Sequence, residues 1–340
     1  MGSKSDSSIR IAILWCFMDI PILLITFNRP NHLKRVLCAL RERKPQELYI
    51  FQDGPRRDIP EDQELVIAVR SVIDEMIDWP CNVHKRYSDC NLGCGPGPVD
   101  GITWFFQNVE YGIIIEDDAI PHLDFFEYAS SLLRKYQSDD TIRVIGSMKI
   151  FEQTYGDGSY YFSMMNRTLC AWASWRRAWD LYDYSMKQYT SKDLKRAMKK
   201  YGATIQEIEY WQDRLEEIHK DCFGNSSWDQ QFWMGIWLTG GKGICPNSNL
   251  STNIGFDETA THTQDGNNVA SCRKLESIIP LIHPTSNKIQ RAADEKFHRL
   301  YFGSPRDYGW MGFRIRLNKK LKKLLHHSGP WLKRSYTNTK

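Results

Sequence analysis

The stretch Gly112–Asp118, which reads GIIIEDD, decides the fold. Consecutive isoleucines without polar alternation are typical of a strand that is buried on both faces. The three acids that follow mark the end of this strand. Two more apolar runs, Ile22–Phe27 and Leu48–Phe51, have the same character and also end at polar residues. The sequence therefore predicts a sheet whose central strands are fully buried.

Helical patterns of apolar residues separate these strands. One begins at Asn31, a second at Pro60, and a third after the glycine- and proline-rich loop at residues 93–98. Strands that alternate with helices predict βαβ units and a largely parallel sheet. The expected fold class is α/β, a mixed, mostly parallel sheet flanked by helices. Residues 18–150 would form a Rossmann-like, nucleotide-binding half of it.

Polar residues follow three of the expected strands, namely Asn28-Arg29, Asp53 and Glu116–Asp118. Ligands of such sheets bind at the carboxyl ends of the strands, so we expect these residues along one edge. Asp53 is either a turn residue or a group that hydrogen-bonds a nucleotide base or ribose. Arg29 is either an ordinary surface arginine or a ligand for phosphate.

The acidic motif Glu116–Asp118 is the sharpest feature of the sequence. Like charges this close repel one another unless a cation is present. Mg²⁺ and Mn²⁺ prefer carboxylates together with substrate phosphates as ligands. The alternative is an exposed acidic turn that caps the following helix. Because the motif follows a buried strand, its position favours a metal site.

The second half, residues 151–287, has a less regular pattern. Trp172, Trp175 and Trp179 are spaced by three and four residues, which predicts the buried stripe of a helix, partly core and partly lining a sugar pocket. A polar helical pair within residues 186–222 is expected to be an exposed insertion. Asp229 opens an aromatic helix, either as its N-cap or as a general base that takes a proton from an acceptor hydroxyl.

Several of these motifs together resemble nucleotide-sugar-dependent glycosyltransferases of the GT-A fold. The motifs that carry the resemblance are Ile22–Pro30, Tyr49–Pro55, Ile114–Asp118, Phe125–Tyr128, Trp172–Trp179 and Ala260–Thr263. The nearest resemblance is to bacterial haemolysin-like (HlpA-like) proteins. A more distant one is to the inverting N-acetylglucosaminyltransferases that start complex N-glycans. By motif order, the resemblance extends from about residue 19 to residue 283.

The resemblance implies a role for each motif. Asp118 is the expected ligand of Mn²⁺ or Mg²⁺, with His262 and Glu116 beside it, and Asp229 is the expected catalytic base. The residues expected to bind the sugar nucleotide are Thr26, Asn28, Arg29, Asp53, Asp117, Trp172 and Ala173. His283 is a second candidate histidine. Glu-Asp-Asp departs from the usual Asp-x-Asp, which leaves open whether Glu116 touches the metal.

The function expected from this resemblance is that of a metal-dependent, inverting glycosyltransferase. It would move a hexosyl or N-acetylhexosaminyl group from a nucleotide sugar, with a UDP-sugar favoured, to a glycan or lipid-linked glycan in bacterial surface glycan assembly. One base and one metal suit a single displacement with inversion.

Two alternatives remain open. A sugar-phosphate nucleotidyltransferase shares the α/β layout and the metal-binding acids. However, Asn28-Arg29-Pro30 stands where that class has a long, glycine-rich basic loop. The other alternative is a non-enzymatic carbohydrate-binding or membrane-active protein, and the acids at the strand ends argue against it.

The net charge of +4 is divided unevenly along the chain. Residues 288–340 carry 14 basic and 3 acidic residues, whereas the remainder carries 31 and 38. A nucleic-acid reader should carry its positive charge on the folded binding face, so no nucleic-acid partner is expected. Residues 313–325 predict a basic amphipathic helix, which either meets an anionic membrane or packs against the body.

The remaining features concern location. Nine scattered cysteines without a Cys-x-x-Cys pair favour reduced thiols and a cytoplasmic protein, with peripheral attachment at the inner face of the membrane as a further expectation. The apolar start lacks a cleavage site, and no uncharged run approaches the ~20 residues of a membrane span. Residues 1–17 are expected to precede the fold, as an expression scar or an over-extended start.

Overall fold

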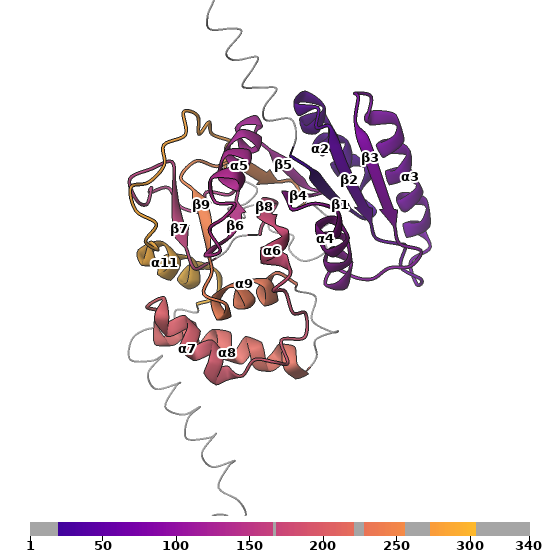
Figure 1. Ribbon diagram of the computed structural model, residues 1–340. Helices are drawn as coiled ribbons and strands as arrows, with labels where there is room; N and C mark the ends of the chain where they lie inside the picture. The colour runs from indigo at the N-terminus through magenta and orange to yellow at the C-terminus, as the bar shows by residue number, and fades with distance from the viewer. Residues whose placement is uncertain (1–19, 166–167, 221–227, 256–272, 304–340) are drawn as a thin grey trace, which may run out of the picture.

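The computed structural model describes residues 20–165, 168–220, 228–255 and 273–303 (Figure 1). Three predictions lie outside these described residues: the role of the chain start, the role of His262, and the amphipathic helix at 313–325. Of the helices within the described ranges, none is long and apolar enough to cross a membrane.

An eight-stranded sheet runs through the molecule in the order β3-β2-β1-β4-β8-β6-β9-β7. Its strands are β1 (Ile22–Thr26), β2 (Glu47–Gln52), β3 (Asn82–Tyr87), β4 (Tyr111–Glu116), β6 (Ile142–Gly146), β7 (Tyr160–Ser163), β8 (Ala171–Trp175) and β9 (Lys242–Pro246). Only β8 and β7 run antiparallel to their neighbours in this sheet. The predicted fold class, a mixed and mostly parallel sheet flanked by helices, is confirmed.

The described helices cover both faces of the sheet. They are α2 (Pro30–Arg43), α3 (Glu61–Met76), α4 (Pro96–Asn108), α5 (Leu123–Lys135), α6 (Arg176–Trp179), α7 (Ser191–Lys200), α8 (Ile205–Lys220), α9 (Asp229–Leu238) and α11 (Arg291–Tyr301). Side chains of α2, α3 and α5 pack on one face, those of α4 and α6 on the other, and α9 contributes to both. The sheet is therefore shielded on both sides, as its apolar strands require.

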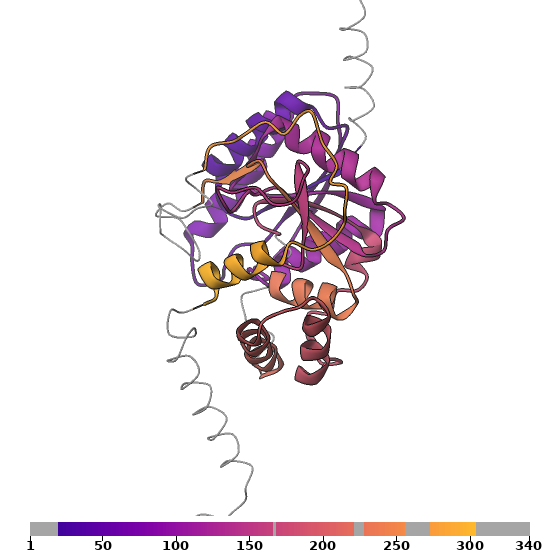
Figure 2. The same cartoon turned by 90° about the vertical axis from the view of Figure 1, so that its left-hand side faces the viewer.

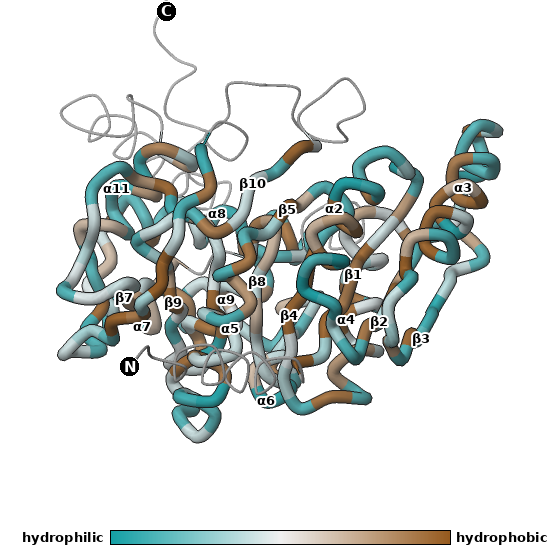
Figure 3. The backbone as a smooth tube through the Cα atoms, turned by 90° about the horizontal axis from the view of Figure 1, so that it is seen from above, coloured by the Kyte–Doolittle hydropathy of each residue, from teal (hydrophilic) through white to brown (hydrophobic). Residues whose placement is uncertain are grey.

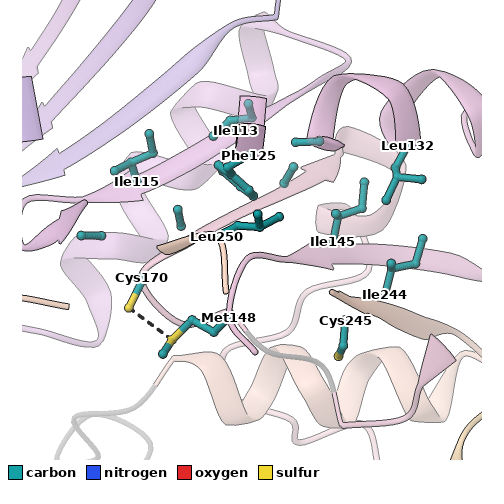
Figure 4. Close-up of a cluster of buried hydrophobic side chains, with 14 of the residues drawn as sticks. Ile113, Ile115, Phe125, Leu132, Ile145, Met148, Cys170, Ile244, Cys245 and Leu250 are labelled. Carbon is teal, nitrogen blue, oxygen red and sulfur yellow. Dashed lines mark hydrogen bonds between the residues drawn. The ribbon is translucent and has the colours of Figure 1, made fainter. Parts of the chain in front are cut away.

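The central strands place alternate side chains in two cores. Ile113 and Ile115 of β4 point into the larger core, where Figure 4 shows them beside Phe125 and Leu250. Ile114 points to the opposite core. Figure 3 shows the apolar residues along β1 and β4 in the middle of the molecule. This burial on both faces is what the isoleucine run predicts.

A small second sheet extends the chain beyond the end of β4. Its strands β5 (Ala119–Pro121) and β10 (Ser251–Asn253) pair antiparallel, with Ala119 opposite Asn253. This pairing brings the segment around residue 253 beside the acidic motif, although Asn253 follows Asp118 by 135 residues in the sequence.

The prediction of one helical tryptophan stripe is wrong. Trp172 and Trp175 lie in strand β8, and the helix that follows, α6, has only four residues. Trp172 packs in one core and Trp175 in the other. A spacing of three residues puts two side chains on opposite faces of a strand, because strand side chains alternate.

The polar helical pair forms as predicted, as α7 and α8, and lies at one end of the molecule in Figures 1 and 2. The pair is not exposed throughout, because Trp211 and Leu215 are fully buried. Helix α11 falls inside the segment that the charge pattern assigns to the tail, and it buries Phe297 in the larger core.

Candidate functional site

The carboxyl ends of β1, β2 and β4 lie side by side at one edge of the sheet (Figure 1). Thr26 at the end of β1 is opposite Gln52 of β2, and Ile25 is opposite Glu116 of β4. The residues that follow these strands therefore converge, which is the geometry that binds ligands in sheets of this kind.

Asp118 is held from two sides. Its Oδ2 accepts a hydrogen bond from Arg29 Nη1 at 2.9 Å, and its Oδ1 accepts one from Asn253 Nδ2 at 3.1 Å. A Cβ atom on Gly255 would lie 2.1 Å from Asp118 Oδ2. Only glycine therefore leaves room for the carboxylate where it stands.

The other two acids of the motif receive fewer hydrogen bonds. Asp117 is buried, and its Oδ2 accepts a hydrogen bond from the backbone N–H of Phe27 at 3.0 Å. Glu116 has the same strand parity as Ile114 and so faces the core that holds Trp172. Among the described residues, none donates a hydrogen bond to the Glu116 carboxylate.

The electrostatics of the motif favour the protonated acids. Burial and the charges of Asp118 and Asp117 raise the pKa of Glu116 well above its usual value. Burial and the charge of Asp118 raise the pKa of Asp117 to about 7. Burial also raises the pKa of Asp118 itself, whereas Arg29 lowers it. Like charges in a shared, poorly solvated site produce such shifts, and they are concentrated at functional sites.

The donor set of the acidic motif has the chemistry of a site for a hard divalent cation, since it consists of carboxylate oxygens. Within the described ranges, no group of three or more His, Cys, Asp or Glu side chains is arranged to hold a metal ion. In this arrangement a guanidinium group lies against Asp118 Oδ2.

Asp229 is the first residue of α9, and the N-cap position is Trp228 rather than Asp229. The charge of Asp229 is one of the causes of the raised pKa of Glu116. The Trp228 ring stacks on Trp172 at 5.8 Å between centroids, and Tyr182 donates a hydrogen bond to the Trp228 carbonyl at 3.2 Å. These contacts fix the start of α9 against β8.

The carboxylate of Asp53 accepts several hydrogen bonds, most of them from a neighbouring loop. Its Oδ1 accepts hydrogen bonds from the backbone N–H of Gly54 and of Leu92, both at 2.8 Å. Its Oδ2 accepts from Asn91 Nδ2 at 3.0 Å and from the Gly93 N–H at 3.1 Å. In this structure the carboxylate therefore organises the loop at residues 91–93.

Two of the side chains that are expected to bind the sugar nucleotide also form hydrogen bonds within the protein. The Thr26 hydroxyl donates to the Phe51 carbonyl at 3.0 Å. Asn28 Nδ2 donates to Asp62 Oδ1 at 2.7 Å, and Asp62 also accepts three hydrogen bonds from Arg56. Asp62 is not among the residues predicted from the sequence, although its position in the first turn of a helix that starts at the same edge was an available signal.

The remaining expected residues lie apart from these. Ala173 packs in the larger core, on the face opposite Trp172, so the structure does not bring the two together. His283 Nδ1 shares a hydrogen bond with the hydroxyl of Tyr160 at 2.9 Å, and that hydroxyl also contacts Tyr136. His262 lies outside the described residues.

Comparisons with known proteins give a coarse likeness. No family model matches the chain. HddC from Yersinia pseudotuberculosis superposes with a TM-score of 0.30 at 10% identity, covering 48% of this chain and 80% of that one. 4-Diphosphocytidyl-2C-methyl-D-erythritol synthase from Anaerococcus prevotii gives a TM-score of 0.29 at 10% identity, covering 48% and 74%.

A UDP-glucose pyrophosphorylase, solved in complex with UDP-glucose, gives a TM-score of 0.29 at 11% identity, covering 48% of this chain and 78% of that one. None of these three is named a glycosyltransferase.

Proposed function

We propose that the protein is an inverting glycosyltransferase that binds a nucleoside-diphosphate sugar at the edge formed by β1, β2 and β4. The observation that carries this proposal is that the acidic motif and Arg29 meet at the carboxyl ends of parallel strands, with the start of α9 packed against the neighbouring strand β8 through Trp228. A UDP-sugar is the favoured donor, because the motifs of this edge resemble those of UDP-sugar enzymes.

Each group has a task in this reaction. The fork of N–H donors on Arg29 suits a phosphate of the donor. Asp229 would accept the proton of the acceptor hydroxyl as its oxygen attacks the anomeric carbon, because a neutral hydroxyl is a poor nucleophile. The stacked rings of Trp172 and Trp228 hold the start of α9, and with it Asp229, against β8, the strand that pairs with β4.

A divalent cation, Mn²⁺ or Mg²⁺, fits the donor set of the motif. Asp118 would hold it, with Glu116 and Asp117 beside it, and His262 remains a proposed further ligand. Such an ion supplies positive charge for the leaving nucleoside diphosphate. The acceptor we propose is a hydroxyl of a glycan or of a lipid-linked glycan, met at the inner face of an anionic membrane.

Nucleotidyl transfer is the second candidate, and the names of the similar solved structures are what favour it. One feature of the chain argues against it. Strand β1 ends at Thr26 and helix α2 begins at Pro30, so three residues connect them. So short a connection leaves no room for a long glycine-rich loop around a nucleoside triphosphate.

Two product assays on the purified full chain distinguish these reactions. A panel of nucleotide sugars with Mn²⁺ is tested for release of the nucleoside diphosphate, and a panel of nucleoside triphosphates with sugar 1-phosphates is tested for release of pyrophosphate. We expect the diphosphate from a UDP-sugar, in greater amount when a glycan acceptor is present. Pyrophosphate without diphosphate would replace our proposal by the second candidate.

Asp229→Asn tests the base. The amide keeps the shape of the side chain but accepts no proton, so turnover should fall by about 10²–10⁴-fold while donor affinity stays the same. Asp180→Asn is the matched control, because Asp180 is exposed at the end of α6. Equal turnover in the two variants would remove Asp229 from the mechanism.

A further inference from the structure

The acidic motif is in contact with a positively charged side chain of the same protein, that of Arg29. Arg29 Nη1 lies 2.9 Å from Asp118 Oδ2, and only 13% of the Arg29 side chain and 14% of the Asp118 side chain are exposed. An ion pair this sheltered from water is screened far less than a surface pair. Arg29 is therefore a substantial part of the local electrostatic field.

The backbone around both partners limits how far the pair can move. Arg29 occupies the N-cap position of α2, where its carbonyl accepts a hydrogen bond from the Leu33 N–H at 3.0 Å. On the other side, Asn253 holds the second oxygen of Asp118, and Gly255 approaches Oδ2 so closely that a Cβ atom would overlap it. The contact between Arg29 and Asp118 is thus built into the end of the sheet.

The charge of Arg29 lies beside the whole motif. Its guanidinium is in direct contact with Asp118, and Asp117 and Glu116 directly precede Asp118 in the chain. One positive charge therefore lies beside three consecutive acidic residues. A divalent cation bound by the same carboxyl groups would likewise compensate their negative charge.

We propose that Arg29 is the counter-cation of the acidic motif and competes with a divalent metal ion for Asp118. This inference rests on the proposed function, in which a metal binds at this motif. An ion bound at Asp118 Oδ2 would lie close to the guanidinium, and the repulsion between them opposes binding. Arg29 thereby keeps the affinity for free metal low until it is drawn away from Asp118.

The test measures binding of Mn²⁺ alone, without nucleotide or acceptor, from the electron paramagnetic resonance signal of the free ion. Arg29→Gln should bind Mn²⁺ at least about tenfold more tightly than the wild type, because it removes one nearby positive charge. Arg35→Gln, which removes an exposed arginine of the same helix, should bind like the wild type. Arg29→Lys keeps the charge and should stay within about threefold of the wild type.

Several outcomes would overturn the proposal. They are equal or weaker Mn²⁺ binding by Arg29→Gln, no detectable binding by it at millimolar Mn²⁺, and an affinity of Arg29→Lys equal to that of Arg29→Gln. Circular dichroism establishes that each variant is folded, and Arg29→Met replaces Arg29→Gln if the latter does not fold. Because the readout needs no catalysis, it is independent of the transferase assay, so the failure of one is distinguishable from the failure of the other.

Discussion

Two clusters in this molecule each place one arginine among carboxylates, and they differ in the hydrogen bonds that those carboxylates receive. In the Arg291 cluster (Arg291, Glu207 and Asp294), the Asp294 carboxylate accepts from the Ser163 hydroxyl, from two backbone N–H groups and from Arg291. Oε2 of Glu207 accepts from the N–H and hydroxyl of Thr204 and from Arg291. These bonds join α8 and α11 to the end of β7.

The acidic motif shows the opposite arrangement. Asp117 has the N–H of Phe27, Asp118 has Arg29 and Asn253, and Glu116 has no hydrogen-bond donor among the described residues. Buried like charges without compensating bonds reduce stability. The Arg291 cluster is therefore part of the scaffold, whereas the acids of the motif lack most of the hydrogen bonds that would make them stabilising, which is more typical of functional residues than of structural ones.

The largest effect should come from breaking the scaffold cluster. Asp294→Ala leaves Arg291, the Ser163 hydroxyl and the backbone N–H groups of Met164 and Met165 without their acceptor. We expect the free energy of unfolding in urea to fall by roughly 3–5 kcal/mol, as for other broken buried ion pairs.

The matched control for this variant is Glu295→Ala on the same helix. Glu295 lies 4.0 Å from Arg291 and 37% of its side chain is exposed, so its removal should cost less than about 1 kcal/mol. A loss below about 1 kcal/mol for Asp294→Ala as well would show that the two clusters do not differ in the way we describe.

A smaller effect should follow from crowding Asp118. Gly255→Ala puts a methyl group 2.1 Å from Asp118 Oδ2, so the carboxylate must move from the position in which Arg29 and Asn253 hold it. We expect a loss of roughly 1–3 kcal/mol in stability, together with weaker binding of UDP in the presence of Mn²⁺. Thermal unfolding and calorimetric titration measure the two quantities.

Gly235→Ala is the control for this variant. Its added methyl group would meet nothing closer than the Leu181 carbonyl at 3.6 Å, in the middle of α9, so stability should be kept or rise slightly. Wild-type stability and UDP binding in Gly255→Ala would show that Asp118 is free to move without consequence.

The sequence predicts the regular part of the molecule well, because that part depends on local patterns. Apolar runs of strand length, separated by amphipathic helices, suffice to place β1, β2 and β4 in one parallel sheet. Their carboxyl ends then follow from the connectivity. The convergence of Arg29, Asp53 and the acidic motif needs no further information, because the polar residues directly follow the strands.

The rest depends on contacts between distant segments. Asn253 and Gly255 reach Asp118 through the pairing of β10 with β5, which no local pattern announces. Trp172 and Trp175 were compatible with a helix by spacing alone, and only their places in two different cores identify a strand. The hydrogen bonds that occupy Asp53 come from a loop about forty residues further on, so its sequence context does not reveal them.

Asp62 lies near the edge formed by β1, β2 and β4, but its carboxylate accepts several hydrogen bonds, as those of the Arg291 cluster do. Its side chain is 1% exposed, and it accepts three hydrogen bonds from Arg56 and one from Asn28. The hydrogen bonds from the Arg56 side chain hold the pKa of Asp62 below its usual value, whereas the pKa of each acid in the motif is raised. Asp62 should therefore stabilise the fold in its ionised form.

The smallest effect we expect is the pH dependence of this contribution. A carboxyl group with a lowered pKa in the folded state stabilises the protein above its unfolded-state pKa, and the contribution is lost as the pH falls through the folded-state value. Asp62→Asn should therefore cost about 1 kcal/mol at neutral pH, a modest value because Arg56 is partly exposed to solvent. The difference in Tm between wild type and Asp62→Asn should be constant above about pH 5 and shrink as the pH falls below about 4.

Asp58→Asn, at an exposed acid of the same loop, should show a difference near zero at every pH. A wild-type advantage over Asp62→Asn that instead grows toward low pH would mean that Asp62 is stabilising when protonated, like the acids of the motif, and would remove the distinction between the two kinds of buried acid.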